Sequence, residues 1–397
     1  MKRRKGIFFR TAAPITWDKM YGDGAPPKSY SGKKINESIA LTYSVVWACV
    51  TLIADAVASL PPSAVVEDVA TGAVTATTLP RWIARPHPEL RRDEVWNQLI
   101  VSLLLWGNGY ALFARRESDG VITGLRPLDP ASVQCEWDAT KPGFRRYKVD
   151  SGPWITSQEI FHLAGPSMPG AAVGMSVIQQ AREAIGLGLT LEEFGARYFS
   201  QGSQAKVVIK VPNKQLKTEE ARDLVNQYER FHRGPGNWHR PAILSGGGDI
   251  VNISIPPEDA QFLESREFQA IDVSRWFRVP PHRVGIISKQ SSWGSGLSEE
   301  NTAMVQHTFR PWILRLESAL TRYSPGGEDA GVRIRLDDAT LLRGSFKEQV
   351  DAWQKAVAGQ IATPNEARRA LGLDPIAGGE TLVTPPAPTF GQPNGGP

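Results

Sequence analysis

The chain has 397 residues, with 45 Lys or Arg against 41 Asp or Glu, so its formal charge is only +4. This near-balance excludes a histone-like protein that holds DNA through a large positive charge. Hydrophobic residues make up 41% of the chain, which is enough to build a core and excludes global disorder. Glycine and proline, at 37 and 30 residues, indicate many turns, but their pattern fits neither collagen nor a coiled-coil rod. With only two cysteines, Cys49 and Cys135, we expect a reducing compartment.

No segment of the sequence predicts export or insertion into a membrane. The basic first five residues resemble the start of a signal peptide, but Arg10 and Pro14 interrupt the apolar stretch that should follow. Two other apolar stretches, 39–54 and 99–114, are shorter than the roughly 20 residues that a spanning helix needs. We therefore expect a soluble chain in which both stretches belong to its core.

In chain order, the first strong element is a helix over about residues 42–60. Its apolar residues recur every three to four positions, and a Pro-Pro pair ends it. Residues 63–80 have the pattern of strands, and a second helix is expected to follow Asp93 and to end at Gly107. The strands expected beyond it are Tyr110–Arg115, Gly124–Leu128, Ser132–Glu136, Arg146–Val149 and Glu159–Leu163.

The second half of the chain is predicted to be mainly helical. A long helix over 176–200 contains interior glycines, which cost about 1 kcal/mol each relative to alanine and indicate close helix packing. The loop 280–296 is too long to be idle in a compact domain, and Pro311 predicts a helix distortion near 308–310. The other expected elements are strands Lys206–Val211, Ala242–Leu244, Ile250–Ile255 and Val332–Leu336, and helices Thr218–His232, Pro257–Phe277, 345–358 and 364–371.

Charge is unevenly distributed over residues 205–279. The segment 205–241 has eight basic and four acidic residues, a net charge of +4, which is as much as the whole chain. The helix expected over 257–279 has five acidic and three basic residues, a net charge of −2. A basic module is therefore followed by an acidic helix.

The sequence has none of the familiar catalytic motifs. There is no P-loop, no H-E-x-x-H zinc motif and no G-x-S-x-G elbow. Asp337 and Asp338 could serve a metal-dependent nuclease, but the side chains of adjacent residues diverge on a strand or a helix. We therefore predict a protein that is not an enzyme and has no catalytic residues, no metal site and no cofactor.

Seven groups of short stretches occur in an order that is typical of one protein family. They make the chain, over roughly residues 38–377, similar to the portal proteins of tailed double-stranded-DNA phages. The stretches are Leu41–Val50 with 58–61, Leu103–Ala111 with Leu125–Pro130, Ala181–Leu187 with Arg197–Gly202, Phe231–Asn237 with Pro257–Glu264, Val279–His282 with Trp293–Gly296, Thr308–Trp312, and Thr363–Arg369.

The resemblance implies an α+β, mainly helical portal fold that assembles as a ring of (usually) twelve subunits. Its parts would be a flexible N-terminal arm (1–35), the first part of the wing (36–175), a stem helix (176–204), the clip (205–256), a second stem helix (257–279), the tunnel loop (280–296), a kinked wing helix with a strand (297–340), the crown (341–377) and a disordered tail (378–397).

The same resemblance implies a function in the virion. Portal rings lie at one capsid vertex and pass DNA inward during packaging and outward at ejection. The expected partners are further copies of the chain, double-stranded DNA, the terminase packaging ATPase, a head–tail adaptor and the major capsid protein, with no membrane. The expected location is the virion, after assembly in the cytoplasm of the host bacterium.

Three groups of residues are expected to carry this function. The tunnel loop would contact DNA through Lys289, Gln290, Ser291, Ser292 and Trp293. The acidic stem helix would repel phosphate, and so keep DNA from sticking, through Glu258, Asp259, Glu264, Glu267 and Asp272. The basic clip would bind an acidic partner through Lys206, Lys210, Lys214, Lys217 and Arg233. The alternatives are another phage structural protein, such as an adaptor or capsid subunit, and the nuclease of Asp337 and Asp338.

Overall fold

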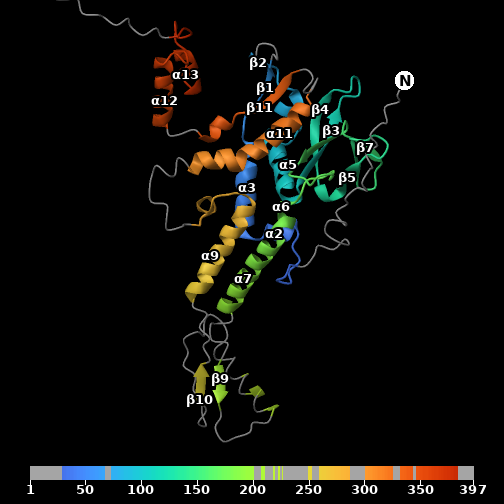
Figure 1. Cartoon of the computed structure of the whole chain (residues 1–397), viewed down its shortest axis with the longest axis vertical. Coiled ribbons are helices and arrows are strands. Elements are labelled where there is room, and N and C mark those ends of the chain that lie inside the picture. The colour runs from blue at the N-terminus through green and yellow to red at the C-terminus, as the bar shows by residue number, and fades with distance from the viewer. Residues whose placement is uncertain are drawn as a thin grey trace, which may run out of the picture. The chain divides into compact units, whose positions relative to one another are not determined.

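The computed structural model describes most of the chain, in two units. The first unit is Met1–Asp337 and the second is Asp338–Pro397. The first combines helices with small antiparallel sheets, and the second is built on two short helices (Figure 1), so the predicted α+β class is confirmed. The described residues are 29–67, 73–200, 207–210, 218–219, 222–223, 226, 249–252, 259–286, 300–324, 331–342 and 346–382.

Two long helices, α3 (Ser44–Ala58) and α5 (Arg92–Trp106), pack against each other in the first unit. The apolar side chains that the three-to-four spacing of α3 predicted to face the core are buried. Helix α5 begins at Arg92 rather than after Asp93, because the carboxylate of Glu94 accepts a hydrogen bond from the backbone amide of Arg91, which makes Arg91 the N-cap residue, two positions earlier than predicted.

Two three-stranded antiparallel sheets follow α5, with strand orders β4-β3-β8 and β5-β6-β7. The five strands predicted here are confirmed within two residues at each end. Strand β7 was missed, because three residues are too few to show an alternating pattern. The strands are β3 (Asn108–Arg115), β4 (Ile122–Leu128), β5 (Val133–Trp137), β6 (Arg145–Val149), β7 (Trp154–Thr156) and β8 (Ile160–Ala164).

A third sheet, of order β11-β1-β2, joins segments that are far apart in the sequence. Helix α11 runs along the open edge of β11, where Glu317 accepts a hydrogen bond from the amide of Leu336 (2.6 Å) and Thr321 accepts one from Ile334 (2.9 Å). A sheet edge that would otherwise pair with other chains is covered in this way. The elements are β1 (Pro62–Glu67), β2 (Val74–Thr77), β11 (Val332–Leu336) and α11 (Arg310–Arg322).

A buried polar network around His162 ties the sheet of β3 to the segment that follows β8. Nε2 of His162 lies 3.0 Å from Oδ1 of Asn108, and Nδ1 lies 3.2 Å from the hydroxyl of Tyr147. Oδ1 of Asn108 is an acceptor that also binds the amide of Gly174 (2.8 Å). Nε2 therefore carries the proton, and Nδ1 accepts from the tyrosine. Both ring nitrogens are satisfied with the imidazole neutral.

We expect His162 to make the protein less stable in mild acid. Burial, helped by the charges of Arg145 and Arg322, holds the pKa of His162 well below its usual range. Below about pH 6.5 the unfolded chain gains a proton that the folded chain refuses, so stability falls as the pH drops. Between pH 6.5 and 5 this one group lowers the free energy of unfolding by at most about 2 kcal/mol. Urea unfolding of His162→Gln should give a weaker loss over this interval than wild type, and an equal loss would contradict the assignment.

The second unit contains helices α12 (Phe346–Ala358) and α13 (Pro364–Ala370), within one residue of the predicted bounds. The predicted capping box of α13 is present. The hydroxyl of Thr363 accepts from the amide of Glu366 (3.2 Å), and the carboxylate of Glu366 accepts from the amide of Thr363 (2.8 Å).

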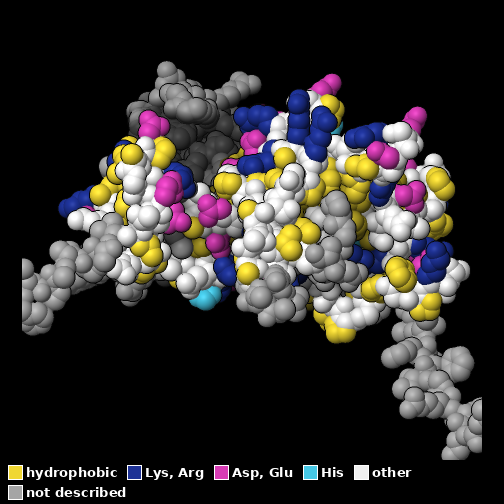
Figure 2. Space-filling view, turned by 90° about the horizontal axis from the view of Figure 1, so that it is seen from above, with side chains coloured by type: hydrophobic (Ala, Val, Ile, Leu, Met, Phe, Trp, Pro, Cys, Tyr) yellow, Lys and Arg dark blue, Asp and Glu magenta, His cyan; other side chains and the backbone are white. Residues whose placement is uncertain are grey.

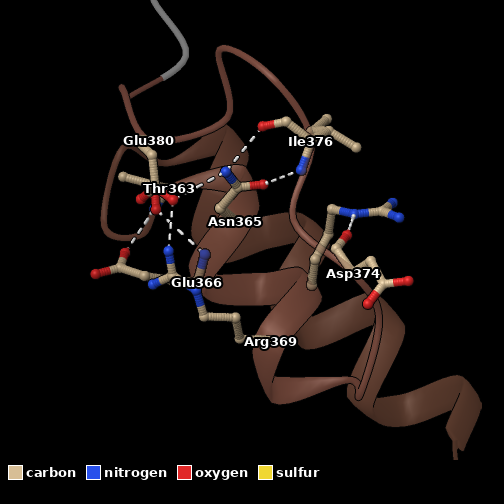
Figure 3. A network of polar contacts seen from close by, with 8 residues as sticks. Thr363, Asn365, Glu366, Arg369, Asp374, Ile376 and Glu380 are labelled. Carbon is tan, nitrogen blue, oxygen red and sulfur yellow. Dashed lines mark hydrogen bonds and ion pairs between the residues drawn. The ribbon is translucent and has the colours of Figure 1, made fainter.

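Asn365 holds the chain that returns after α13 (Figure 3). Its side chain donates to the carbonyl of Ile376, accepts from the amide of Ile376 and donates to the carboxylate of Glu380 (3.0 Å). Its backbone amide donates to the carbonyl of Gly379 (2.9 Å). The start of the tail predicted over 378–397 is therefore part of this unit, because a buried asparagine needs these partners. The rest of the tail lies outside the described residues, as does most of the predicted N-terminal arm.

None of the helices in the described ranges is long and apolar enough to cross a membrane. The remaining elements are α2 (Glu37–Ala40), α4 (Arg81–Ala84), η1 (Pro130–Ser132), α6 (Val177–Gln180), α7 (Arg182–Ser200), β9 (Val207–Lys210), β10 (Asp249–Asn252), α9 (Asp259–Trp276), η3 (Pro281–Val284), the π-helical turn η4 (Val305–Phe309) and η6 (Asp338–Leu342).

Candidate functional site

Helices α7 and α9 lie side by side and form the centre of the candidate site (Figure 1). The side-chain amide of Gln269 donates to the carbonyl of Ala184 (2.8 Å), and Arg266 lies 3.9 Å from the carboxylate of Glu192. A later residue of α7 thus meets an earlier residue of α9, so the two helices are antiparallel. The chain leaves the first unit's core along α7 and returns along α9.

The helix predicted over 176–200 is in fact two helices, α6 and α7, with a break at Ala181. Ser176 caps α6 by accepting from the amide of Gln179 (3.1 Å). The break was missed because neither glycine nor proline stands at this point. Helix α6 packs against α5.

Two of the three interior glycines of α7 are explained by contacts inside the same chain. A Cβ atom at Gly188 would lie 2.7 Å from the ring of Tyr43, and one at Gly186 would lie 2.5 Å from the hydroxyl of Ser29. We expected these glycines to admit another helix, and the structure instead puts a tyrosine ring and a serine there. Burial, with the nearby Glu192 carboxylate, raises the pKa of Tyr43 to about 12, so this ring packs as a neutral phenol.

The acidic residues predicted on α9 differ in what they contact. Glu264 and Glu267 are exposed and have no basic partner among the described residues. Asp272 is half-buried and pairs with Arg275 at 3.2 Å. Asp259 is the first residue of the helix, with its side chain outside the described part, and Glu258 lies outside it altogether. Among the side chains of α9 that the structure describes, the uncompensated negative charge is therefore at Glu264 and Glu267.

Two contacts hold together the two ends of the predicted tunnel loop, between α9 and α11. Arg278 adopts a left-handed conformation (φ 58°), and its carbonyl accepts a hydrogen bond from the hydroxyl of Thr308 (2.5 Å). His282 on η3 lies 3.3 Å from the carboxylate of Glu300. The contacts between Arg278 and Thr308 and between His282 and Glu300 thus join the chain before residues 287–299 to the chain after them.

The predicted distortion near 308–310 corresponds to the π-helical turn η4, which directly precedes Pro311. A proline in a helix lacks an amide hydrogen and its ring clashes with the preceding turn. A π-helical turn relieves that clash by widening the helix, and such turns recur at functional sites. Here the wide turn contains Thr308, the residue that binds the carbonyl of Arg278. Sequence reasoning found the proline and missed this contact, which joins residues 30 positions apart.

Several predicted site residues lie outside the described part of the chain. These are the five tunnel-loop residues, Lys289, Gln290, Ser291, Ser292 and Trp293, and the clip residues Lys206, Lys214, Lys217 and Arg233. Lys210 is the last residue of β9, which pairs with β10 in an antiparallel ribbon, and its side chain is not described. The predictions made for these residues remain predictions.

The described part of the chain contains no group of three or more His, Cys, Asp or Glu residues that could hold a metal ion. Asp337 follows β11 and Asp338 begins η6. Neither carboxylate belongs to such a group within the described residues.

Comparison with known proteins identifies this arrangement. The family model described as phage portal protein matches residues 44–372. A probable portal protein of Streptomyces phage phiC31 is 31% identical over 88% of this chain and 78% of its own length. The portal protein of Enterobacteria phage HK97 is 30% identical over 88% of this chain and 83% of its own length. A chain in a structure of the neck of a native gene transfer agent particle, computed with C12 symmetry, is 24% identical, with a TM-score of 0.58 over 85% of this chain and 93% of that chain.

These findings first define a class, the structural head–tail connectors of virions. Within that class, the chain belongs to the phage portal protein family. The family is structural, in line with the prediction of a portal protein made from the seven sequence stretches.

Proposed function

We propose that the chain forms a closed ring, of twelve copies, at one vertex of the capsid, and that DNA passes through its channel during packaging and ejection. The observation that carries this proposal is the antiparallel pair α7 and α9 with its exposed carboxylates Glu264 and Glu267. The family match over residues 44–372 and the likeness to a neck computed with C12 symmetry support it.

In this proposal α7 and α9 are the stem, β9 and β10 belong to the clip, and the second unit is the crown. Closing a ring requires contacts between unlike surfaces of neighbouring copies. Large apolar side chains that are exposed on the stem supply such surfaces. They are Leu187 and Phe194 on α7 and Phe268 and Trp276 on α9.

Glu264 and Glu267 would line the channel and keep the duplex from adhering to it. Every contact between a phosphate and a cation releases counterions, so a ring of unpaired cations would hold DNA tightly. Unpaired carboxylates repeated around the ring have the opposite effect. The tunnel loop would contact the duplex through Lys289 and Trp293, and the basic clip would bind the terminase or a head–tail adaptor.

The assembly state tests this proposal most directly. Light scattering on the purified full chain should give a mass of about 520 kDa, which is twelve times 43.5 kDa, and negative-stain images should show rings with a central channel. A ring with another subunit number would correct only the count. A protein that stays monomeric over a range of concentration, salt and pH, and that is inactive as a portal in phage particles, would overturn the proposal. Shells in place of rings would favour a capsid subunit.

A further inference from the structure

Two exposed arginines lie over a pair of aromatic rings at one end of the first unit. The ring centroids of Phe113 on β3 and Tyr323 at the end of α11 are 5.1 Å apart. The guanidinium of Arg115 lies 5.7 Å from the centre of the first ring, and that of Arg322 lies 5.8 Å from the centre of the second. Cation–π contact at these distances holds a guanidinium over a ring.

Strand β11, which is hydrogen-bonded to α11, carries two more arginines. Arg333 and Arg335 are exposed and alternate with buried residues, so they share one face of the strand. The hydrogen bond from Ile334 to Thr321 joins β11 to α11 one residue before Arg322. Figure 2, which views the molecule from above, shows several Lys and Arg side chains close together on that side. We call the four residues Arg115, Arg322, Arg333 and Arg335 the arginine face.

Most of this positive charge is uncompensated. Arg333 pairs with Glu67 at 2.8 Å. Arg322 and Arg335 have no carboxylate partner among the described residues. Arg115 donates to the backbone carbonyls of Gly120 (2.6 Å) and Gln158 (2.5 Å), which fix its position and do not neutralise its charge.

The arrangement is more specific than scattered surface charge. Contacts hold three of the four guanidinium groups, those of Arg115, Arg322 and Arg333, so these three lose little side-chain entropy when they bind. Arginine presents a planar fork of donors that matches the oxygens of a phosphate, and such charge-assisted pairs are among the strongest hydrogen bonds in proteins. The arginine face presents arginine alone, which favours a ligand with repeated anionic groups.

We propose that the arginine face is a second nucleic-acid contact, outside the channel, that binds the phosphate backbone of duplex DNA without reading its sequence. The choice of DNA over an acidic protein rests on the proposed function, which brings duplex DNA to this molecule. Contacts to phosphate position a protein on DNA and carry no base information, so the face would hold packaged or entering DNA in any sequence context.

Fluorescence anisotropy with a labelled 30-base-pair duplex tests this proposal in the full-length protein. The Arg322→Ala/Arg335→Ala variant should bind more weakly than wild type by about 10-fold or more at 100 mM salt. The slope of log K against log salt should become shallower by about 2, because each lost phosphate contact removes about 0.9. The matched control is Arg91→Ala/Arg116→Ala, which removes two arginines that already pair with Asp93 and Asp119, and it should bind like wild type.

An unchanged affinity and slope in the Arg322→Ala/Arg335→Ala variant would overturn the proposal. Equal or tighter binding of poly-glutamate at the same salt concentration would also overturn it, in favour of an acidic protein partner. The outcome is separable from that of the proposed function, since light scattering on the same samples reports the ring. If the protein forms a ring and the arginine-face variant binds DNA normally, only the second contact is disproved. If the variant loses duplex binding but neither protein forms a ring, only the channel is disproved.

Discussion

Replacing Gly174 with alanine is expected to lower the free energy of unfolding by about 3 kcal/mol or more. A Cβ atom at this position would lie 2.3 Å from the carbonyl oxygen of Gly107 and 2.6 Å from the amide nitrogen of Gly165. Both neighbours are backbone atoms, and they are hydrogen-bonded to each other at 2.9 Å. Neither can turn aside as a long side chain does, so the crossing segments must separate. The hydrogen bonds between Gly174 and Asn108, which hold the network around His162, would be strained as well.

The measurement is a urea titration of wild type and variant, followed by circular dichroism. Gly120→Ala is the matched control, because Gly120 has a left-handed backbone (φ 68°) but nothing within 4 Å of a Cβ atom. It should cost about 1 kcal/mol from backbone conformation alone. Failure of the Gly174→Ala variant to accumulate as a folded protein agrees with the expectation. A loss no larger than that of the control would show that the crossing can open at little cost.

This crossing illustrates which parts of the fold the sequence could predict. Periodicity predicted α3, α5 and the strands β3 to β6, because each has a buried face whose spacing is visible locally. Gly107 was predicted as the end of a helix, and its left-handed conformation (φ 75°) agrees. Gly107 has a second role, because the backbone at Gly165 and Gly174 packs directly against it. That role depends on segments about 60 residues away. No local pattern contains that information, and the same is true of Gly188 and the ring of Tyr43.

The candidate site divides in the same way. The acidic composition of α9 could be read from the sequence, but which carboxylates are neutralised could not. Arg275 pairs with Asp272 within α9, at a spacing of three residues, whereas Arg266 lies near Glu192 of α7 only because the two helices pack antiparallel. The arginine face is also invisible in the sequence, because its members come from three elements.

Reversing the charge of Glu264 and Glu267 together is expected to reduce the yield of DNA-filled particles by at least about 10-fold. Under the proposed function, the Glu264→Lys/Glu267→Lys variant replaces two carboxylates with two ammonium groups in every copy of the ring. Because neither carboxylate has a basic partner in the described chain, the exchange breaks no ion pair there. They would bind phosphate, and the summed counterion release around a ring would hold the duplex in place.

The variant should be tested by complementing a phage that lacks its own portal gene, with packaged DNA and titre as readouts. The control is Glu89→Lys/Glu117→Lys, which changes the charge equally at two exposed residues outside α7 and α9, and it should package normally. Light scattering must show that both variants form the same ring, so that a packaging defect reports the channel and not assembly. High salt weakens contacts between phosphate and lysine, so DNA translocation in a purified packaging reaction should recover in part as salt is raised. A variant that forms rings and packages DNA like wild type at low salt would show that the exposed carboxylates of α9 do not line the path of the DNA.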